Sequence, residues 1–195
     1  FIKTVGENKC HLVTADGGFD YSKNYNLQEN DSYRLIFCEI YLSLNIQKTN
    51  GNFIIKIFDL FNYKTQQLIY FLYNHYQHIE IYKPLTSRLS NSEKYIICLG
   101  YKGCPKNDLD IFKKNFENYD KLWIDVPKSF LDNLNNYNEL YVSSQIQKIE
   151  EILDMINKKK DERIYNQIVN QQKNNAVKWC KDYSLPINKY SSYLK

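Results

Sequence analysis

Two carboxylates and one lysine stand at or inside apolar runs of the chain, and together they could move a proton. Asp16 closes the run CHLVTAD and is followed by Gly17 and Gly18, which permit a tight turn and a close ligand approach. Lys56 lies inside NFIIKIF, and Glu93 begins EKYIICLGY. A lysine inside a buried strand needs a partner or a task, because an unpaired buried ammonium is costly. These residues are therefore candidates for one site.

Each candidate also has a simpler explanation. Asp16 alone is typical of a turn or helix-capping acid, and Lys56 alone is typical of a salt-bridged lysine at the rim of a sheet. The three residues belong to different predicted strands, however, and functional groups collect at the carboxyl ends of parallel strands. The three residues could therefore converge on one end of a sheet, and the separate structural roles stay open at this point.

Apolar runs and amphipathic segments predict the elements that position these residues. Asn50 and Gly51 should break the chain before one of the strands. Helical crossovers imply parallel neighbours in a sheet that is covered on both faces, which is an α/β fold. The loop between the last two strands could form a hairpin, so an antiparallel edge strand is expected. The predicted strands are 10–16, 52–58, 78–84 and 93–101, and the predicted helices are 28–47 and 65–76.

The chain changes character at about residue 104, where glycine disappears and long polar helices begin. Helices are predicted at 107–120 and, with an interruption, at 139–181. The second carries an apolar stripe from Ile146 to Ile156, which we expect to pack. The sequence thus predicts a first domain at 1–103 and a helical extension at 104–195 that packs on the sheet, with Trp123 and Trp179 as packing residues.

Composition restricts the class of protein only loosely. The chain has 195 residues, a net charge of +4 and five cysteines without a CxxC pair, which favours a reduced, intracellular protein. His11, His75 and His78 form no metal-ligand pattern with the cysteines, so no metal is predicted. No run of about 18 apolar residues is present, so no membrane contact is expected.

Four motifs resemble the FtsJ/RrmJ-type RNA ribose 2′-O-methyltransferases. The motifs are VTADGGFD, NLQE, GNFIIKIFDLF and KPLTSRLSNSEKYIIC, and they are most similar to the branch that methylates the first transcribed nucleotide of capped mRNA. The resemblance spans about residues 10–101. It implies the second half of a Rossmann-like, S-adenosylmethionine-dependent methyltransferase sheet, followed by a helical C-terminal extension.

The resemblance also implies roles for the candidate residues. The family uses a Lys-Asp-Lys-Glu tetrad, and Asp16, Lys56 and Glu93 match its aspartate, second lysine and glutamate. A free lysine has a pKa of about 10.4 and is a poor base, so burial and a nearby cation would have to activate Lys56 as the base. The carboxylates would orient it, and alignment would supply much of the rate without a metal.

The same resemblance implies residues that touch the ligands. Asp16 and Gly17 would contact S-adenosylmethionine, although the family's main cofactor loop lies upstream. Charge alone adds Lys83 as a phosphate contact. On the capped RNA or beside it would lie Asn26, Gln28, Ser87, Arg88 and Asn91.

The chain departs from the family pattern before Asp16. Only 15 residues precede it, Lys3 and Lys9 are too close to serve as the first tetrad lysine, and no glycine-rich turn is present. We expect either a carboxyl-terminal piece of a larger enzyme or a natural half-domain that serves as an inactive RNA-binding or scaffold subunit. Retention of all three candidates favours the enzyme. In both cases the sheet edge beside 10–16 should be covered by another segment or chain.

Partners and location follow from the resemblance as expectations. Capped mRNA would be the substrate, and other capping or transcription proteins are further partners. Ribosomal RNA is the alternative substrate, but NLQE and TSRLSNSEKY favour the cap branch. The abundance of Asn, Ile, Lys and Tyr suggests an AT-rich genome, of a large DNA virus or a protist, and hence a cytoplasmic protein, in a viral factory or virion, with the nucleus left open.

Overall fold

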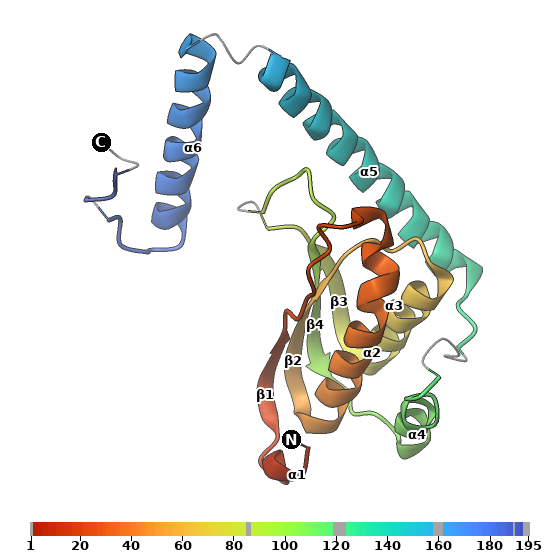
Figure 1. The fold of residues 1–195 in the computed structure, drawn as a ribbon. Helices are drawn as coiled ribbons and strands as arrows, with labels where there is room; N and C mark the ends of the chain where they lie inside the picture. Colours follow the sequence, from red (N-terminus) through yellow and green to blue (C-terminus); the bar gives the residue numbers. More distant parts are fainter. Residues whose placement is uncertain (1, 85–86, 119–123, 158–161, 189, 193–195) are drawn as a thin grey trace. The chain divides into compact units, whose positions relative to one another are not determined.

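The computed structural model describes residues 2–84, 87–118, 124–157, 162–188 and 190–192. The chain divides into two compact units, Phe1–Ile146 and Gln147–Lys195. The first unit holds a four-stranded sheet with helices packed on it (Figure 1). The predicted α/β class, with the second half of a Rossmann-like sheet and helices after it, is confirmed.

The sheet has the order β1-β2-β4-β3. Its strands are β1 (Cys10–Ala15), β2 (Gln47–Ile57), β3 (Tyr76–Tyr82) and β4 (Lys94–Tyr101). β1 and β2 are parallel, and β4 is antiparallel to both β2 and β3. The expected antiparallel strand is thus present, but it lies between β2 and β3 and β3 is the edge. The last residues of β1, β2 and β3 meet the first residues of β4 at one end of the sheet, which we call the carboxyl end.

The helices connect and cover these strands. Two of them, α2 and α3, are the crossovers that the sequence predicts between the first three strands, within a residue or two of the expected bounds. The bounds are α1 (Ile2–Val5), the 3₁₀ turn η1 (Tyr25–Leu27), α2 (Gln28–Ile46), α3 (Tyr63–His75), α4 (Lys106–Lys114), α5 (Lys128–Asn157) and α6 (Glu162–Asp182).

The hydrophobic core lies on one face of the sheet. Phe53, Ile55 and Ile57 alternate along β2, are fully buried and join a cluster with residues of α2 and α3. The residues between them, Ile54 and Lys56, are only half-buried. Right-handed crossovers that advance in the same direction across a sheet place their helices on the same face. The expectation that both faces are covered is therefore wrong for the described residues.

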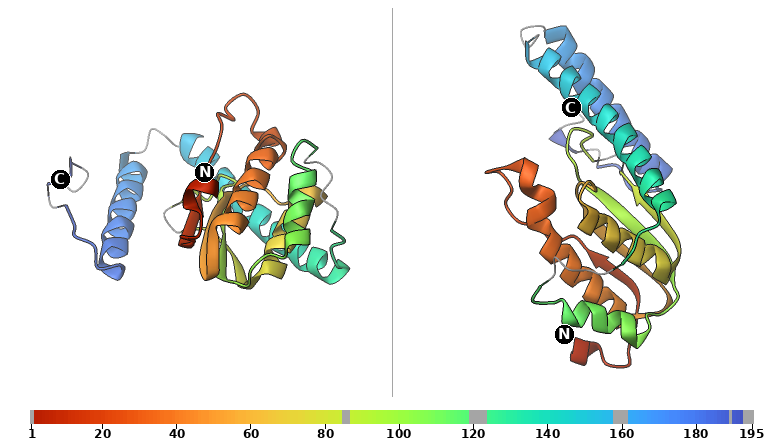
Figure 2. Two further views of the ribbon diagram at one scale, coloured as in Figure 1. Left: turned by 90° about the horizontal axis from the view of Figure 1, so that it is seen from below. Right: turned by 90° about the vertical axis from the view of Figure 1, so that its right-hand side faces the viewer.

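The first compact unit extends well past residue 103. Phe112 of α4 is fully buried, with its ring centroid 4.6 Å from that of Phe37 and 4.8 Å from that of Phe71. Leu134 of α5 belongs to the same core. Figure 2 shows α4 beside α2. The boundary expected between 103 and 104 therefore does not coincide with the division in the structure, which falls inside α5.

The later helices differ from their predicted bounds. α4 ends at Lys114 rather than at 120, and α5 begins at Lys128 rather than at 139. The stripe from Ile146 to Ile156 is exposed, with side chains of 39 to 57% relative exposure, so its expected packing is not observed. Trp179 packs against Tyr183 within the second unit, with the two rings tilted at 41° to each other, and Trp123 lies outside the described residues.

β2 begins directly after α2, five residues earlier than predicted. Asn50 and Gly51 do not break the chain there, because the pairing with β1 shifts register between Cys10 and Leu12 and accommodates them. Asn50 has a φ of 63°, and a Cβ on Gly51 would lie 2.8 Å from the Lys48 carbonyl oxygen.

Among the described helices, none is long and apolar enough to cross a membrane.

Candidate active site

Asp16 and Lys56 meet at the carboxyl end of the sheet. The parallel register pairs Ala15 with Ile55, which puts the residues that follow each of them side by side. The Lys56 ammonium donates a hydrogen bond of 2.5 Å to the main-chain carbonyl of Asp16. Lys56 lies on the half-exposed face of β2, so the expected buried lysine is instead accessible from the uncovered side of the sheet.

Tyr95 connects this pair to Glu93. Lys56 and Tyr95 are direct partners across β2 and β4. The Tyr95 hydroxyl donates to Glu93 Oε1 at 3.4 Å. Burial raises the pKa of Tyr95, and the negative charges of Glu93 and then Asp16 raise it further. Tyr95 therefore stands between the two carboxylates, and the three predicted catalytic residues lie in one row across neighbouring strands.

A cavity of about 460 Å³ opens beside this row. Five of the predicted site residues line this cavity, and Glu93 is the carboxylate among them. Asp16, Lys56, Lys83 and Ser87 are not among the lining residues. The predicted residues that line the cavity are Asn26, Gln28, Arg88, Asn91 and Glu93, and the others are Tyr25, Phe58, Asp59, Ser90, Ser92 and Gln145.

Lys83 holds the loop that carries Asn91 and Glu93. Its ammonium donates to the Asn91 carbonyl at 3.1 Å, to Asn91 Oδ1 and to the Glu93 carbonyl. Burial lowers the pKa of Lys83 to about 8, against the Glu93 charge, which raises it. The phosphate contact expected for Lys83 stays a prediction, as does the role of Ser87, whose amide donates to the Pro84 carbonyl.

Lys94 is a functional-site residue that the sequence reasoning missed. Its side chain has 1% exposure, and its ammonium donates to the carbonyls of Phe58 at 2.9 Å and Ser92 at 3.0 Å. Asp59 lies 3.5 Å away. Burial lowers the pKa of Lys94, and the Asp59 charge opposes that shift. The buried ammonium thus ties the end of β2 to the start of β4, and its only sequence signal is its place directly after Glu93.

Two residues of α5 bind the loop that contains Ser90 and Asn91. The Tyr141 hydroxyl donates to the Asn91 carbonyl at 2.7 Å, and Gln145 Nε2 donates to the Ser90 carbonyl at 3.1 Å. The Lys94 ammonium lies 4.2 Å from the Tyr141 ring centroid, within the range of a cation–π interaction. Tyr141 and Gln145 are four residues apart, which places both on one helical face. The predicted extension therefore contributes to the site.

The two glycines after Asp16 have different neighbours, and that of Gly17 is Glu39 of α2. Its Oε1 accepts the Gly17 amide at 3.0 Å, and burial raises the pKa of Glu39 while that hydrogen bond and the Lys56 charge oppose the shift. A Cβ on Gly17 would lie 2.5 Å from that oxygen and 2.9 Å from Leu35 Cδ2. Gly17 thus lets the turn approach α2, whereas a Cβ on Gly18 would lie 3.5 Å from the Lys56 ammonium.

The residues expected to touch S-adenosylmethionine do not form a complete site. The Gly17 amide is already bonded to Glu39, and the Asp16 side chain is exposed. Neither residue lines the 460 Å³ cavity or a second hollow of about 450 Å³ along α2. Asp16 and Gly17 supply at most one wall for that cofactor, so their contact with it stays a prediction.

Comparison with known proteins identifies the sequence family of this chain. The family described as FtsJ-like methyltransferase matches residues 1–101. The human cap-specific mRNA (nucleoside-2′-O-)-methyltransferase 1 is 44% identical over 92 residues, which are 47% of this chain and 11% of that protein. The cap-specific mRNA (nucleoside-2′-O-)-methyltransferase of Autographa californica nuclear polyhedrosis virus is 39% identical over 114 residues, which are 57% of this chain and 44% of that protein.

A solved structure is also similar in part. It is described as a ribosomal RNA methyltransferase from Plasmodium falciparum, with 20% identity, a TM-score of 0.39 and coverage of 52% of each chain. The present chain thus spans about a tenth of the mammalian relatives that it matches and less than half of the viral one.

Proposed function

The chain belongs to the FtsJ-like methyltransferase family, and on this premise we propose that it carries the Asp-Lys-Glu part of an enzyme that methylates capped mRNA. The site of methylation would be the ribose 2′-hydroxyl of the first transcribed nucleotide. The observation that carries the proposal is the row from Asp16 through Lys56 and Tyr95 to Glu93, beside a polar cavity. The similarity to two proteins named for cap-specific methylation supports the choice of substrate.

The residues of the row have distinct roles in this reaction. S-adenosylmethionine supplies the methyl group when it is bound. Lys56 accepts the proton of the 2′-hydroxyl as the general base. Asp16 holds Lys56 through its carbonyl, and Glu93, oriented by Tyr95, holds the ribose. Correct alignment of the hydroxyl then supplies much of the rate.

The cavity suits a nucleotide rather than an apolar ligand. Its volume of about 460 Å³ lies in the range of ordinary small-ligand pockets. Asn26, Gln28 and Asn91 offer amide donors and acceptors for base edges, and Arg88 offers a charged donor for phosphate. Gln28 is held by Ser92, whose hydroxyl donates to Gln28 Oε1 at 2.8 Å. Tyr25 adds an exposed ring on which a base could stack.

The proposal also includes a partner for the free edge of β1. Among the described strands β1 pairs only with β2, and Leu12 on it is 57% exposed. An unpaired edge with an exposed leucine favours pairing with another segment or chain. Hydrogen exchange in the full-length protein should show protected amides at Leu12 and Thr14, and rapid exchange there would remove this partner.

The experiment measures methyl transfer by the full-length protein to three RNAs. Radiolabelled S-adenosylmethionine is supplied with capped RNA, with the same RNA uncapped, and with a ribosomal RNA fragment, and the modified nucleotide is mapped by nuclease digestion. The proposal predicts label on the first nucleotide of the capped RNA alone. Equal labelling of uncapped or ribosomal RNA would favour the ribosomal alternative. Tight binding of capped RNA without any transfer would favour the RNA-binding scaffold.

A further inference from the structure

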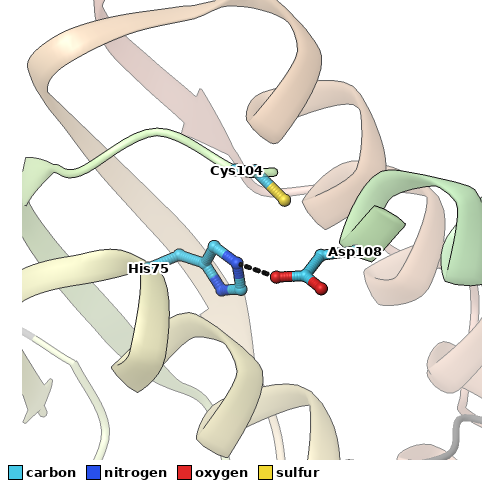
Figure 3. Close-up of side chains that lie close together, drawn as sticks. All are labelled: His75, Cys104 and Asp108. Carbon is cyan, nitrogen blue, oxygen red and sulfur yellow. Dashed lines mark hydrogen bonds and ion pairs between the residues drawn. The ribbon is translucent and has the colours of Figure 1, made fainter. Parts of the chain in front are cut away.

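A second group of reactive side chains lies at the end of the sheet opposite the carboxyl end. His75 is the last residue of α3, Cys104 follows β4, and Asp108 lies in the first turn of α4. Their ligand atoms all lie within 4.8 Å of one another. Figure 3 shows the imidazole, the sulfur and the carboxylate pointing into the same space. Within the part of the chain that the structure describes, no other trio of His, Cys, Asp or Glu is grouped in this way.

The imidazole of His75 is oriented as metal-binding histidines usually are. Nδ1 lies 2.8 Å from the Phe71 carbonyl, which can only accept, so Nδ1 must carry a proton. The Phe71 ring stacks on the imidazole with centroids 4.2 Å apart. Nε2 then faces Asp108 Oδ2 at 3.1 Å. A histidine that ligates through one nitrogen typically donates the other N–H to a backbone carbonyl or carboxylate, as here.

From this geometry we propose that His75, Cys104 and Asp108 bind one Zn²⁺ ion, with water in the fourth position. An imidazole nitrogen, a thiolate and a carboxylate oxygen are all ligands that zinc uses. The Asp108 side chain is 36% exposed, which leaves solvent access for the water. The ion would replace the proton between Nε2 and Asp108 and the thiol proton of Cys104, and both protons would pass to solvent.

The three ligands can close around an ion with little rearrangement. Tetrahedral zinc with these ligands places their donor atoms roughly 3.3–3.8 Å apart. Nε2 and Oδ2, at 3.1 Å, are already close to that separation, so the sulfur has to approach them by at most about 1 Å. The side chain that must move follows Gly103, which has a φ of 92° and open space around its Cβ position. The main chain of His75 is held in place, because its carbonyl accepts the Lys102 amide at 2.9 Å. The ion would tie the end of α3 to the start of α4.

The competing explanation is a metal-free ion pair. His75 and Asp108 alone would link α3 to α4, and Cys104 would be a half-buried packing residue. Both explanations predict that His75 and Asp108 stabilise the fold. Only the zinc site predicts a sulfur–metal bond, so the test must detect that bond directly and cannot rest on stability.

The experiment uses Co²⁺ as a spectroscopic probe of the full chain, followed by competition with Zn²⁺. Coordination predicts a thiolate-to-cobalt charge-transfer band in the near ultraviolet and tetrahedral bands in the visible, all abolished by Zn²⁺. Cys104→Ser should lose the charge-transfer band, whereas Cys180→Ser, which removes another half-buried thiol, should keep it. Asp108→Asn should weaken Zn²⁺ binding by at least about tenfold, as loss of even an outer-shell partner does, and His78→Gln should not.

Two results with Co²⁺ would overturn the proposal. One is a folded chain, checked by near-ultraviolet circular dichroism, that gives no charge-transfer band with Co²⁺. The other is a Cys104→Ser variant that keeps the band, because the thiolate would then come from elsewhere. Asp108→Asn provides a second variant if Cys104→Ser fails to fold, since unchanged Zn²⁺ affinity in a folded Asp108→Asn chain also contradicts the site.

Discussion

The two ends of the sheet assemble their polar groups in different ways. At the carboxyl end, Asp16, Lys56 and Glu93 each belong to a contiguous motif, and a buried lysine, Lys94, fastens the loops between them. At the opposite end, the groups come from single positions far apart in the chain, as in His75 with its partner in α4. Short motifs therefore reveal the first end from the sequence, whereas only the folded chain reveals the second.

Replacing Lys94 should give the largest loss of stability and should disrupt the carboxyl end alone. Lys94→Met leaves the Phe58 and Ser92 carbonyls without their buried donor. Such a loss costs about 3 kcal/mol in the free energy of unfolding, measurable by urea denaturation. Hydrogen exchange should quicken in the 90–93 loop before it does so at Tyr101. Lys48→Met, on the exposed start of β2, is the control and should stay within about 0.5 kcal/mol of wild type.

A result in which Lys94→Met and Lys48→Met are equally stable would contradict the fastening role of Lys94. Loss of protection at both ends together would instead show that the two ends unfold as one, and the comparison between them would fail.

The two glycines after Asp16 provide the next largest contrast. Gly17→Ala forces a Cβ to within 2.9 Å of Leu35 Cδ2, and overpacking of this kind costs about 1–3 kcal/mol. In Gly18→Ala the new Cβ would meet the Lys56 ammonium at 3.5 Å, an ordinary contact. Thermal denaturation of the two variants should therefore show a lowered midpoint for the first only. Equal midpoints would mean that the turn does not pack on α2 as described.

The pH dependence of Lys83 gives a third contrast, at the loop before Glu93. Burial lowers its pKa to about 8 in the folded chain, from an ordinary value near 10.5. Between these values the unfolded chain binds more protons, so the folded state gains stability as pH rises. The stability of wild type minus that of Lys83→Met should therefore increase from about pH 8 to pH 10.5. A difference that is flat over this window would show that the ammonium is not desolvated.

Much of the sheet and part of the site could be predicted from the sequence. Continuous apolar runs located β1 and β4 to within a residue, and helix periodicity located α2 and α3. Pattern alone could not order the strands, because insertion of β4 beside β2 depends on long-range pairing such as that of Lys56 with Tyr95. It also gave no sign that the Gly17 amide donates to Glu39, a residue 22 positions later.

The helical part shows a further limit of pattern reading. Tyr141 and Gln145 reach the loop at Ser90 and Asn91 from α5, but nothing in their local sequence indicates that contact. Likewise, the spacing of the histidines and cysteines led to the prediction of no metal-ligand pattern, and the trio around His75 includes an aspartate that this spacing does not consider. Contacts between elements far apart in sequence are fixed by packing, which residue spacing does not encode.

The central claim is that the carboxyl end of the sheet is the reactive end, and one matched pair of variants on β2 tests it. Lys56→Ala and Lys48→Ala are compared in the full-length protein by single-turnover methyl transfer to capped RNA. Loss of the base should lower the rate about 10²–10⁴-fold in Lys56→Ala, and Lys48→Ala should remain at the wild-type rate. A Lys56→Ala protein as active as Lys48→Ala would remove Lys56 as the base and contradict the account.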